Sequence, residues 1–480
     1  MNRSAIRPVR RFFAVAALAA AAGACADDPT SVPANAAGAE PRLAIPAGPY
    51  TPGQSYTGRN GYIEYIAGNT PFIFAAPHGG SLTPSEIPDR TEALCDTTAI
   101  VTQADANTEQ LVREIQSAFY SRTGKYPHVI INKLYRGKLD PNRSMRTGAC
   151  GDAEAEIAWD EYHDFINAAK SRVSADYGRG WYTDIHGHGH TLQRLEIGYL
   201  LEATDLEQTD ATLDGSLSYE NESSFRTFSA NTTVKFSDLL RGPGSLGTLL
   251  RQAGYPSVPS DSMPDPGGNP YFTGGYSLQQ HGCAGGGNIC GLQIEHNYTG
   301  VRDNATNRAA YAAALVRVYE TYLAQNFSFS LWAGAGDIMV DNDNANNDTT
   351  VAKFTWTSSW ALNSQQTDKH LNSYRLADGA GPTNDGASFK FYISSPGSYK
   401  VYAWWTDATS RTTSASYRIF ELDGGTLLAD LLVNQQVNGG QWNLLGTYTF
   451  GQVGWAKVLM SRSLSGAGKI SADAIRVQRA

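Results

Sequence analysis

Apolar and polar positions follow two kinds of pattern between about residues 50 and 326. Continuous apolar runs bounded by Gly or Pro are typical of strands that are buried on both faces. Such a run spans residues 71–80, and residues 126–134, 181–187 and 291–297 are also predicted to be strands. Other segments repeat apolar residues at helical spacing, namely 107–124, 153–173 and 303–325. Strands and helices that alternate on this scale predict an α/β fold with a largely parallel sheet.

The pattern changes after residue 327. Short runs rich in Tyr, Trp, Thr and Val alternate apolar with polar positions and are separated by Gly, Asn and Asp. Regular short strands of this kind predict an antiparallel β-sandwich over residues 337–480, joined to the first domain by a linker at 327–336. Two domains also suit the length of the chain.

The N-terminus has the pattern of an export signal. Four arginines precede an apolar run at residues 12–24 that is too short to span a bilayer. The run ends in "AAGAC", which resembles a lipobox and makes Cys25 the candidate lipidated residue. Ala22 stands where that pattern prefers Leu, so a plain secreted N-terminus is the alternative. We expect a signal peptide at 1–25 and a flexible tether at 26–49.

Charge and hydropathy limit the classes of partner that we expect. The formal net charge is −8, with acids and bases mixed along the chain, which argues against a nucleic-acid partner. No second apolar run approaches the ~18 residues of a membrane span. Contact with a membrane is therefore expected only through a lipid anchor, and the protein is expected at the cell surface, in the periplasm or outside the cell.

The cysteines support export. Four remain once Cys25 is set aside, and they can form two disulfides in an oxidising compartment. Cys283 and Cys290 bracket a Gly-rich loop, which leaves Cys95 and Cys150 as the second pair. A zinc site made of cysteines is disfavoured because the chain has no C-x-x-C pair.

Polar side chains follow several of the predicted strands. In parallel α/β sheets such strand ends carry the functional groups. The candidates are His78, Arg136, Asn142, Arg143, Asp184, His186 and Glu295. Two imidazoles, carboxylates and arginines are what a catalytic zinc site needs: metal ligands, a base for the water and a cation for the substrate.

Over about residues 50–325 the chain resembles the N-formylglutamate amidohydrolase-like family, within the wider zinc-carboxypeptidase superfamily. "PHGGSLTPSEI" resembles the first metal segment of the family, which implies that His78 and Glu86 are metal ligands. The carboxypeptidase branch places its Glu three residues after the His, where this chain has Ser81. Asp89 is therefore the competing second ligand.

Three further segments extend the resemblance. "DIHGHG" implies that His186 is the third zinc ligand, and "LQIEHN" implies that Glu295 is the catalytic base. "LDPNRS" resembles the segment that holds a substrate carboxylate, through Asn142 and Arg143, and Arg136 is a weaker candidate for such a contact. Together they imply a Zn²⁺-dependent amidohydrolase. Its substrate would end in a carboxylate, as in an acyl-glutamate, a γ-glutamyl chain or a peptide C-terminus.

Several residues have alternative interpretations. His186, His188 and His190 alternate and share one face of an extended segment, so a local three-histidine site is conceivable. We interpret His188 instead as a residue behind the ligands or in the pocket wall, and His190 as a loop residue. Asp184 either orients a ligand histidine or makes a hydrogen bond at the end of the strand. Arg143 either binds substrate or pairs with a surface acid.

Residues from about 337 to 480 resemble the golvesin C-terminal-like domain, a β-sandwich module of secreted bacterial enzymes. The resemblance rests on "MVDNDN", "GSYKVYAWWTDATSRTTSASYRI", "NQQVNGGQWNLLGTYTF" and "ISADAIRVQ". We expect Trp404, Trp405 and Trp442 in the core of the sandwich; the alternative is a face that stacks on sugars. "DNDNANND" lacks the Gly and Glu of an EF-hand loop and predicts a solvated loop.

The sequence therefore predicts an exported zinc amidohydrolase with an attached β-sandwich. The rival hypothesis is a non-catalytic glycan- or cell-wall-binding lipoprotein whose α/β domain holds no metal.

Overall fold

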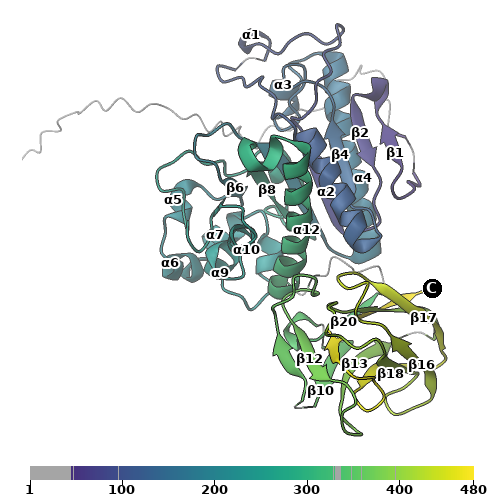
Figure 1. Cartoon of the computed structure of the whole chain (residues 1–480). Helices are drawn as coiled ribbons and strands as arrows, with labels where there is room; N and C mark the ends of the chain where they lie inside the picture. The colour runs from purple at the N-terminus through teal and green to yellow at the C-terminus, as the bar shows by residue number, and fades with distance from the viewer. Residues whose placement is uncertain are drawn as a thin grey trace, which may run out of the picture.

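The computed structural model describes most of the chain (Figure 1). The described residues are 45–46, 48–95, 97–327, 329, 337–347, 349–357, 359–394 and 396–480. The predicted signal peptide, Cys25 and most of both predicted linkers lie outside these ranges. Among the described helices, none combines the length and the apolar character that a membrane crossing requires.

An eight-stranded sheet forms the centre of the first domain, in the order β1-β2-β4-β3-β5-β8-β6-β7. Its strands are β1 (Ser55–Thr57), β2 (Ile63–Ile66), β3 (Phe72–Ala76), β4 (His128–Asn132), β5 (Gly180–Gly187), β6 (Leu195–Gly198), β7 (Ser257–Val258) and β8 (Ile289–His296). The central strands β4, β3, β5 and β8 are parallel. β2 and β6 join them antiparallel and β1 pairs antiparallel with β2, so the sheet is mixed and the prediction of a parallel sheet holds for its centre.

Three long helices cover the two faces of this sheet. They are α2 (Thr108–Thr123), α4 (Ala153–Tyr177) and α12 (Ala305–Phe327). Alternate residues of β3 contact different helices: Phe72 and Phe74 belong to the core cluster that holds α2 and α12, whereas Ile73 and Ala75 belong to the cluster that holds α4. A strand buried on both faces has no polar side, which explains its continuous apolar run.

Shorter helices lie in the connections. They are α1 (Glu92–Cys95), α3 (Met145–Gly148), α5 (Ala203–Leu206), α6 (Asp210–Gly215), α7 (Leu217–Glu222), α8 (Arg226–Ser229), α9 (Phe236–Arg241), α10 (Leu246–Gln252) and α11 (Tyr276–His281). Short 3₁₀ or π turns occupy Arg59–Gly61, Tyr298–Arg302 and Asn344–Asn346.

Both predicted disulfides are confirmed. Cys95–Cys150 joins the end of α1 to the turn after α3. Cys283–Cys290 closes the Gly-rich loop that enters β8. Disulfides persist in oxidising compartments, so both bonds agree with export.

The second domain is a sandwich of antiparallel strands, as predicted. A five-stranded sheet in the order β10-β13-β18-β15-β16 faces a four-stranded sheet, β17-β14-β20-β9, and β11-β12-β19 form a third sheet. The strands are β9 (Ile338–Asp341), β10 (Ala352–Trp356), β11 (Ala361–Asn363), β12 (Tyr374–Asp378), β13 (Gly386–Ile393), β14 (Gly397–Trp404), β15 (Ala415–Phe420), β16 (Leu427–Val433), β17 (Asn443–Phe450), β18 (Gly454–Ser461), β19 (Lys469–Ala472) and β20 (Ala474–Arg479). In β13, buried positions alternate with partly exposed ones, as period-2 patterning requires.

The sandwich packs against α2 and α12 (Figure 1). Nε2 of His370 lies 3.1 Å from Oε1 of Glu320 in α12. The guanidinium of Arg122, in α2, lies 4.6 Å from the centre of the Trp404 ring. Trp404 and Trp405 are buried, and the Trp442 ring lies 5.4 Å from Trp404. Trp404 and Trp405 are therefore core residues and do not form a face for stacking on sugars.

Candidate metal centre

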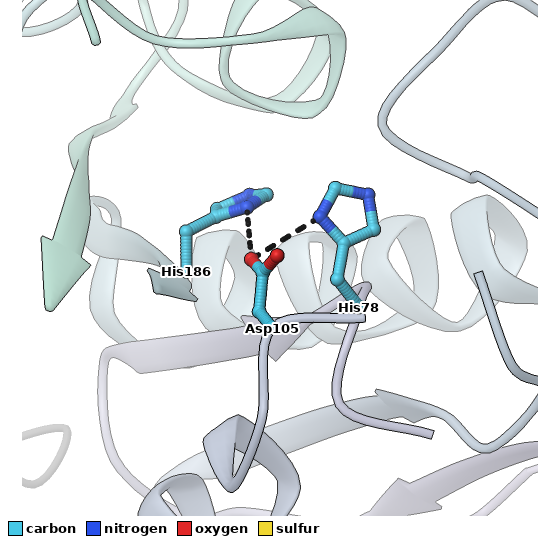
Figure 2. Close-up of side chains that lie close together, drawn as sticks. All are labelled: His78, Asp105 and His186. Carbon is cyan, nitrogen blue, oxygen red and sulfur yellow. Dashed lines mark hydrogen bonds and ion pairs between the residues drawn. The ribbon is translucent and has the colours of Figure 1, made fainter. Parts of the chain in front are cut away.

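Three side chains from distant parts of the chain meet at the carboxyl ends of β3 and β5 (Figure 2). His78 follows β3, His186 lies in β5, and Asp105 lies in the loop before α2. Nδ1 of His78 is 3.3 Å and Nδ1 of His186 is 3.2 Å from Oδ2 of Asp105. The two ring centres are 4.7 Å apart. The parallel pairing of β3 with β5 thus brings together two histidines that the sequence separates widely.

The second nitrogen of each ring faces a buried carboxylate. Nε2 of His78 lies 2.6 Å from Oδ1 of Asp140, and Nε2 of His186 lies 3.1 Å from Oδ2 of Asp184. A carboxylate that is hydrogen-bonded to one nitrogen of a histidine, as Asp140 is to Nε2 of His78, fixes the tautomer and the ring orientation and makes the other nitrogen a better metal ligand. Asp184 lies close to His186 as an ion-pair contact, and the hydrogen-bond contact at Nε2 of His186 is with Asn142. The two Nδ1 atoms and the Asp105 carboxylate therefore form a donor set that suits zinc.

Arginines balance these carboxylates. Nε of Arg136 donates to Oδ2 of Asp140 (3.0 Å), and its Nη1 donates to Oδ1 of Asp105 (3.4 Å). Burial by itself raises the pKa of Asp105, but His78, His186 and Arg136 outweigh it and hold the pKa well below its usual range. The pKa of Asp140 is lowered in the same way, chiefly by Arg136 against the opposing effect of burial. Both groups are thus carboxylates, the form that binds a cation.

Glu295 lies beside this group. It is the register partner of His186 in the β5–β8 pair, and its Oε1 is 3.9 Å from Nδ1 of His186. Gln293 donates to the same oxygen (2.9 Å). Burial raises the pKa of Glu295 to about 8. A carboxyl group with a raised pKa next to the front nitrogen of a histidine is suited to accepting and returning a proton.

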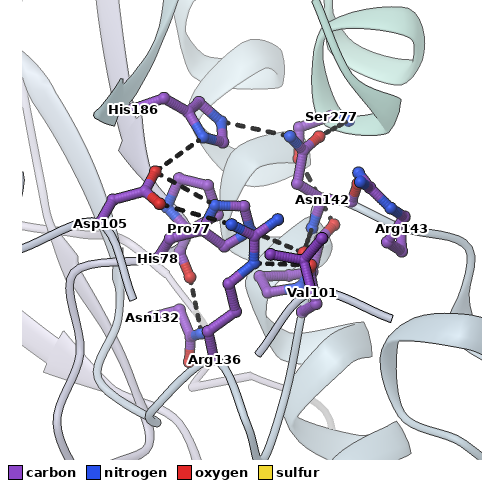
Figure 3. A network of polar contacts seen from close by, with 12 residues as sticks. Pro77, His78, Val101, Asp105, Asn132, Arg136, Asn142, Arg143, His186 and Ser277 are labelled. Atoms are coloured by element: carbon purple, nitrogen blue, oxygen red, sulfur yellow. Dashed lines mark hydrogen bonds and ion pairs between the residues drawn. The ribbon is translucent and has the colours of Figure 1, made fainter. Parts of the chain in front are cut away.

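Asn142 contacts His186, and Arg143 lies beside Asn142 (Figure 3). Nδ2 of Asn142 is 3.2 Å from Nε2 of His186, and its Oδ1 accepts from the backbone N–H of Ser277 (2.8 Å). Nη1 of Arg143 donates to the Asn142 carbonyl (2.8 Å), and Arg143 is half-buried. The Asn142 amide thus makes contacts inside the protein, and its expected contact with a substrate stays a prediction.

The expected carboxylate ligand is also corrected. The Glu86 side chain is exposed and accepts a hydrogen bond from the Tyr62 hydroxyl. Asp89 is exposed too, and it pairs with Lys138 (2.8 Å). Neither belongs to the group around His78, because the chain turns away after Gly80 and Leu82 bridges to Leu134. Asp105 occupies the place that the sequence assigned to Glu86.

Arg136 is buried between two acids, and this differs from its expected role. Its partners are Asp105 and Asp140, so it holds the carboxylates of the centre. Oδ2 of Asp184 lies 3.1 Å from Nε2 of His186, and its role in orienting that ring stays a prediction.

His188 and His190 stand apart from this group. With Glu196 of β6 they form a second cluster. Nε2 of His188 contacts the Arg194 carbonyl (2.8 Å), and Nδ1 of His190 lies 2.8 Å from Oε1 of Glu196. The three alternating histidines therefore do not share one site.

Asp105, Asp140 and Glu196 were not anticipated from the sequence. Asp105 lies in "QADANTEQ", where nothing but its place before a helix distinguishes it from other loop acids. Asp140 stands next to the "PNRS" segment that was singled out, so its position at a strand-end loop was the available signal.

Comparison with known proteins identifies the second domain. Residues 338–479 match the Golvesin C-terminal domain family. A xanthan lyase from Bacillus sp. (strain GL1) is 30% identical over 141 residues, which are 29% of this chain and 14% of the lyase. The chain thus spans a small part of that relative. Residues 338–479 are therefore similar to the Golvesin C-terminal domain.

Two solved structures are also similar to parts of the chain. N-formylglutamate amidohydrolase from Ralstonia eutropha is 15% identical, with a TM-score of 0.32, over 53% of this chain and 94% of the other. A family 35 carbohydrate binding module from Clostridium thermocellum is 12% identical, with a TM-score of 0.22, over 30% of this chain and all of the module (100%).

Proposed function

We propose that the first domain is a zinc-dependent hydrolase that cleaves an amide bond next to a carboxylate-bearing residue. The observation that carries this proposal is the arrangement of His78, Asp105 and His186. Each histidine turns one nitrogen toward Asp105 and has its other nitrogen next to a buried carboxylate. Such pairing is typical of histidines that ligate a metal.

The chemistry follows from the surrounding groups. Bound zinc would supply Lewis acidity and lower the pKa of a water toward ~7. Glu295 is positioned to accept the proton of an attacking water and to deliver it to the departing amine. Arg136 keeps Asp105 and Asp140 ionised and oriented. Water exclusion by the buried surroundings strengthens each of these electrostatic contacts.

Substrate selection is assigned to Arg143. Arg136 is already committed to two acids, whereas Arg143 is half-buried at the edge of the centre. A guanidinium there can hold a carboxylate by paired charge-assisted hydrogen bonds. We infer a substrate whose leaving residue bears a free carboxylate: an acyl-glutamate, a γ-glutamyl compound or a peptide C-terminus.

Purified full-length protein tests this proposal through its zinc content and its hydrolysis of carboxylate-bearing amides. We expect one zinc per chain in wild type and in Glu86→Gln, and loss of zinc in Asp105→Asn. The Glu86 variant is the matched control because it removes the acid that the sequence favoured. Glu295→Gln should keep zinc and lose about 10²- to 10⁴-fold in kcat, the usual contribution of a general base.

The opposite outcome has a definite meaning. Protein that binds no zinc and hydrolyses none of these amides contradicts the proposal. It then favours the rival function, in which the chain is a non-catalytic glycan- or cell-wall-binding protein.

For the Golvesin C-terminal domain we propose attachment to a polysaccharide, because a xanthan lyase contains a similar segment. Depletion of the full-length protein from solution by insoluble cell wall or xanthan tests this role, and no depletion by either contradicts it.

A further inference from the structure

Three large apolar side chains lie on loops near Glu295, at the same edge of the sheet. We call Leu192, Phe272 and Tyr298 the apolar rim. They are 45%, 44% and 45% exposed, respectively. They come from three separate loops, which follow β5, precede α11 and follow β8. Exposed apolar side chains that gather next to a candidate catalytic group indicate contact with a ligand.

Contacts through Glu196 connect the rim to Glu295. Glu196 is the register partner of Glu295 in the β6–β8 pair. Its Oε2 accepts from the backbone N–H of Phe272 (3.0 Å), and its Oε1 lies 2.8 Å from Nδ1 of His190. The His190 ring in turn stacks on Phe272, with centres 4.9 Å apart. Phe272 is therefore held one side chain away from Glu295.

The loops of the rim are fixed by hydrogen bonds. The Tyr271 hydroxyl donates to the Ile197 carbonyl (2.6 Å). The backbone N–H of Thr299 donates to Oε1 of Gln193 (3.2 Å), which joins the loop of Tyr298 to that of Leu192. The rim thus belongs to an ordered surface, on which its apolar side chains are held in contact with water at a cost in free energy.

The arginines near the rim are turned inward. Arg194 and Arg302 are each 3% exposed. Arg302 donates to the carbonyls of His296 (3.0 Å) and His188 (2.9 Å), and Nη2 of Arg194 donates to the Pro266 carbonyl (3.5 Å). These cations stabilise the loops. Neither guanidinium is exposed at the rim, which suits an uncharged group and disfavours a chain of carboxylates.

The order of the strands places the two ends of a substrate. Asn142 and Arg143 adjoin His186 of β5 on one side. The rim lies on the other side, beyond β8 and next to β6. A substrate whose scissile amide lies at His186 and Glu295, with its carboxylate at Arg143, would therefore extend its acyl side toward the rim.

We propose that the acyl side of the substrate carries a large apolar or aromatic group that packs on Leu192, Phe272 and Tyr298. The substrate class is then an N-acylated amino acid, or a peptide with an apolar residue before the scissile amide. Short formyl or acetyl groups and γ-linked polyglutamate are poor substrates on this account. The inference rests on the proposed function for the orientation of the amide.

Calorimetric binding to full-length, zinc-loaded Glu295→Gln tests the rim without hydrolysis. N-benzoyl-glutamate and N-acetyl-glutamate share the carboxylate end and differ only in the acyl group. We expect N-benzoyl-glutamate to bind about 10- to 100-fold more tightly, as burial of an aromatic ring predicts. A second substitution, Phe272→Ala, should reduce that ratio at least about threefold, since it removes one of three contacts. Leu217→Ala is the matched control, because Leu217 is 70% exposed in α7, outside the rim.

Equal affinity for the two ligands, no measurable binding of either, or a ratio unchanged by Phe272→Ala overturns the inference. Hydrolysis by the wild type separates this result from the proposed function. If the binding preference is retained but neither amide is hydrolysed, the proposed function is contradicted and the role of the rim is supported. If both amides are hydrolysed at equal rates, the proposed function is supported and the role of the rim is contradicted.

Discussion

Two buried clusters in this protein combine histidine with carboxylates, and they differ in how many imidazoles face one carboxylate. In the first domain, His78 and His186 each have one nitrogen next to a carboxylate behind the ring, and the other turned toward Asp105. At the junction between the domains, one ring lies between two acids. Nδ1 of His370 is 2.9 Å from Asp341, and its Nε2 is 3.1 Å from Glu320.

The difference teaches that composition alone does not define a metal centre. Asp341, His370 and Asp473 also bring potential ligand atoms close together. However, this cluster contains a single imidazole, and the contact of its Nε2 with Glu320 crosses between the domains. The backbone N–H of His370 also donates to Asp473 (3.0 Å). We therefore interpret the junction cluster as a set of contacts that holds the two domains together, and the first cluster as the metal centre.

The largest expected effect contrasts the two clusters directly. His186→Ala should weaken zinc binding by more than the roughly 10- to 100-fold that follows loss of an outer partner, because it removes a ligand. His370→Ala should leave zinc content unchanged. Metal analysis of both variants after dialysis checks this, and loss of zinc in the His370 variant alone would reverse the assignment.

A substitution at the junction between the domains should lower the free energy of unfolding. Glu320→Ala removes a carboxylate that contacts both Arg122 and His370. We expect a loss of about 3 kcal/mol in the free energy of unfolding, the lower end for breaking a buried ion pair. Glu222→Ala, at an exposed position, should stay within about 0.5 kcal/mol. Urea denaturation measures the unfolding free energy of both variants, and equal stability would contradict the stabilising role of Glu320 at the junction.

Substitution of the carboxylate next to Nε2 of His186 should have a smaller effect on the affinity for zinc. Asp184→Asn should weaken zinc binding about 10- to 100-fold, because the amide orients His186 without its charge. The matched change at the junction, Asp473→Asn, should have none. Competition with a chromophoric chelator gives the two affinities, and identical values would show that Asp184 does not support a metal ligand.

A third histidine environment sharpens the comparison through pH. Burial lowers the pKa of His128 to about 3, and the ring accepts hydrogen bonds from Tyr65 and Gly68 without a carboxylate. Below pH ~6.5 the unfolded chain binds a proton there that the folded protein does not, so stability falls as the pH drops toward 3. Each pH unit costs about 1.4 kcal/mol.

The substitution His128→Asn, which keeps an acceptor, tests this dependence. Its unfolding free energy, measured by urea denaturation between pH 7 and 4, should fall less steeply than that of the wild type. Parallel slopes for the two proteins would contradict the assignment.

Much of this fold could be predicted from local patterns. The continuous apolar run of β3 and the helical spacing of residues 107–124 are each determined by neighbouring residues, so the sequence indicates them. The antiparallel edges of the sheet were not predictable in this way. β2 and β6 are short, and their direction is set by which distant strand they pair with.

The residues of the candidate metal centre also differ in how far the sequence could predict them. His78, His186 and Glu295 stand at or near the ends of apolar strands, where periodicity singles them out. Asp105 comes from a loop that reaches the centre through tertiary packing alone, fixed by the Gly187 N–H that donates to its carboxylate (3.0 Å). The resemblance of one segment to a known metal segment therefore implied Glu86, whose side chain is exposed to solvent.

Anomalous diffraction at the zinc edge from crystals of the full-length protein tests the central claim most directly. The account predicts one strong peak between Nδ1 of His78, Nδ1 of His186 and the Asp105 carboxylate. A peak at Asp341, His370 and Asp473 instead, or no peak in zinc-supplemented crystals, would contradict it.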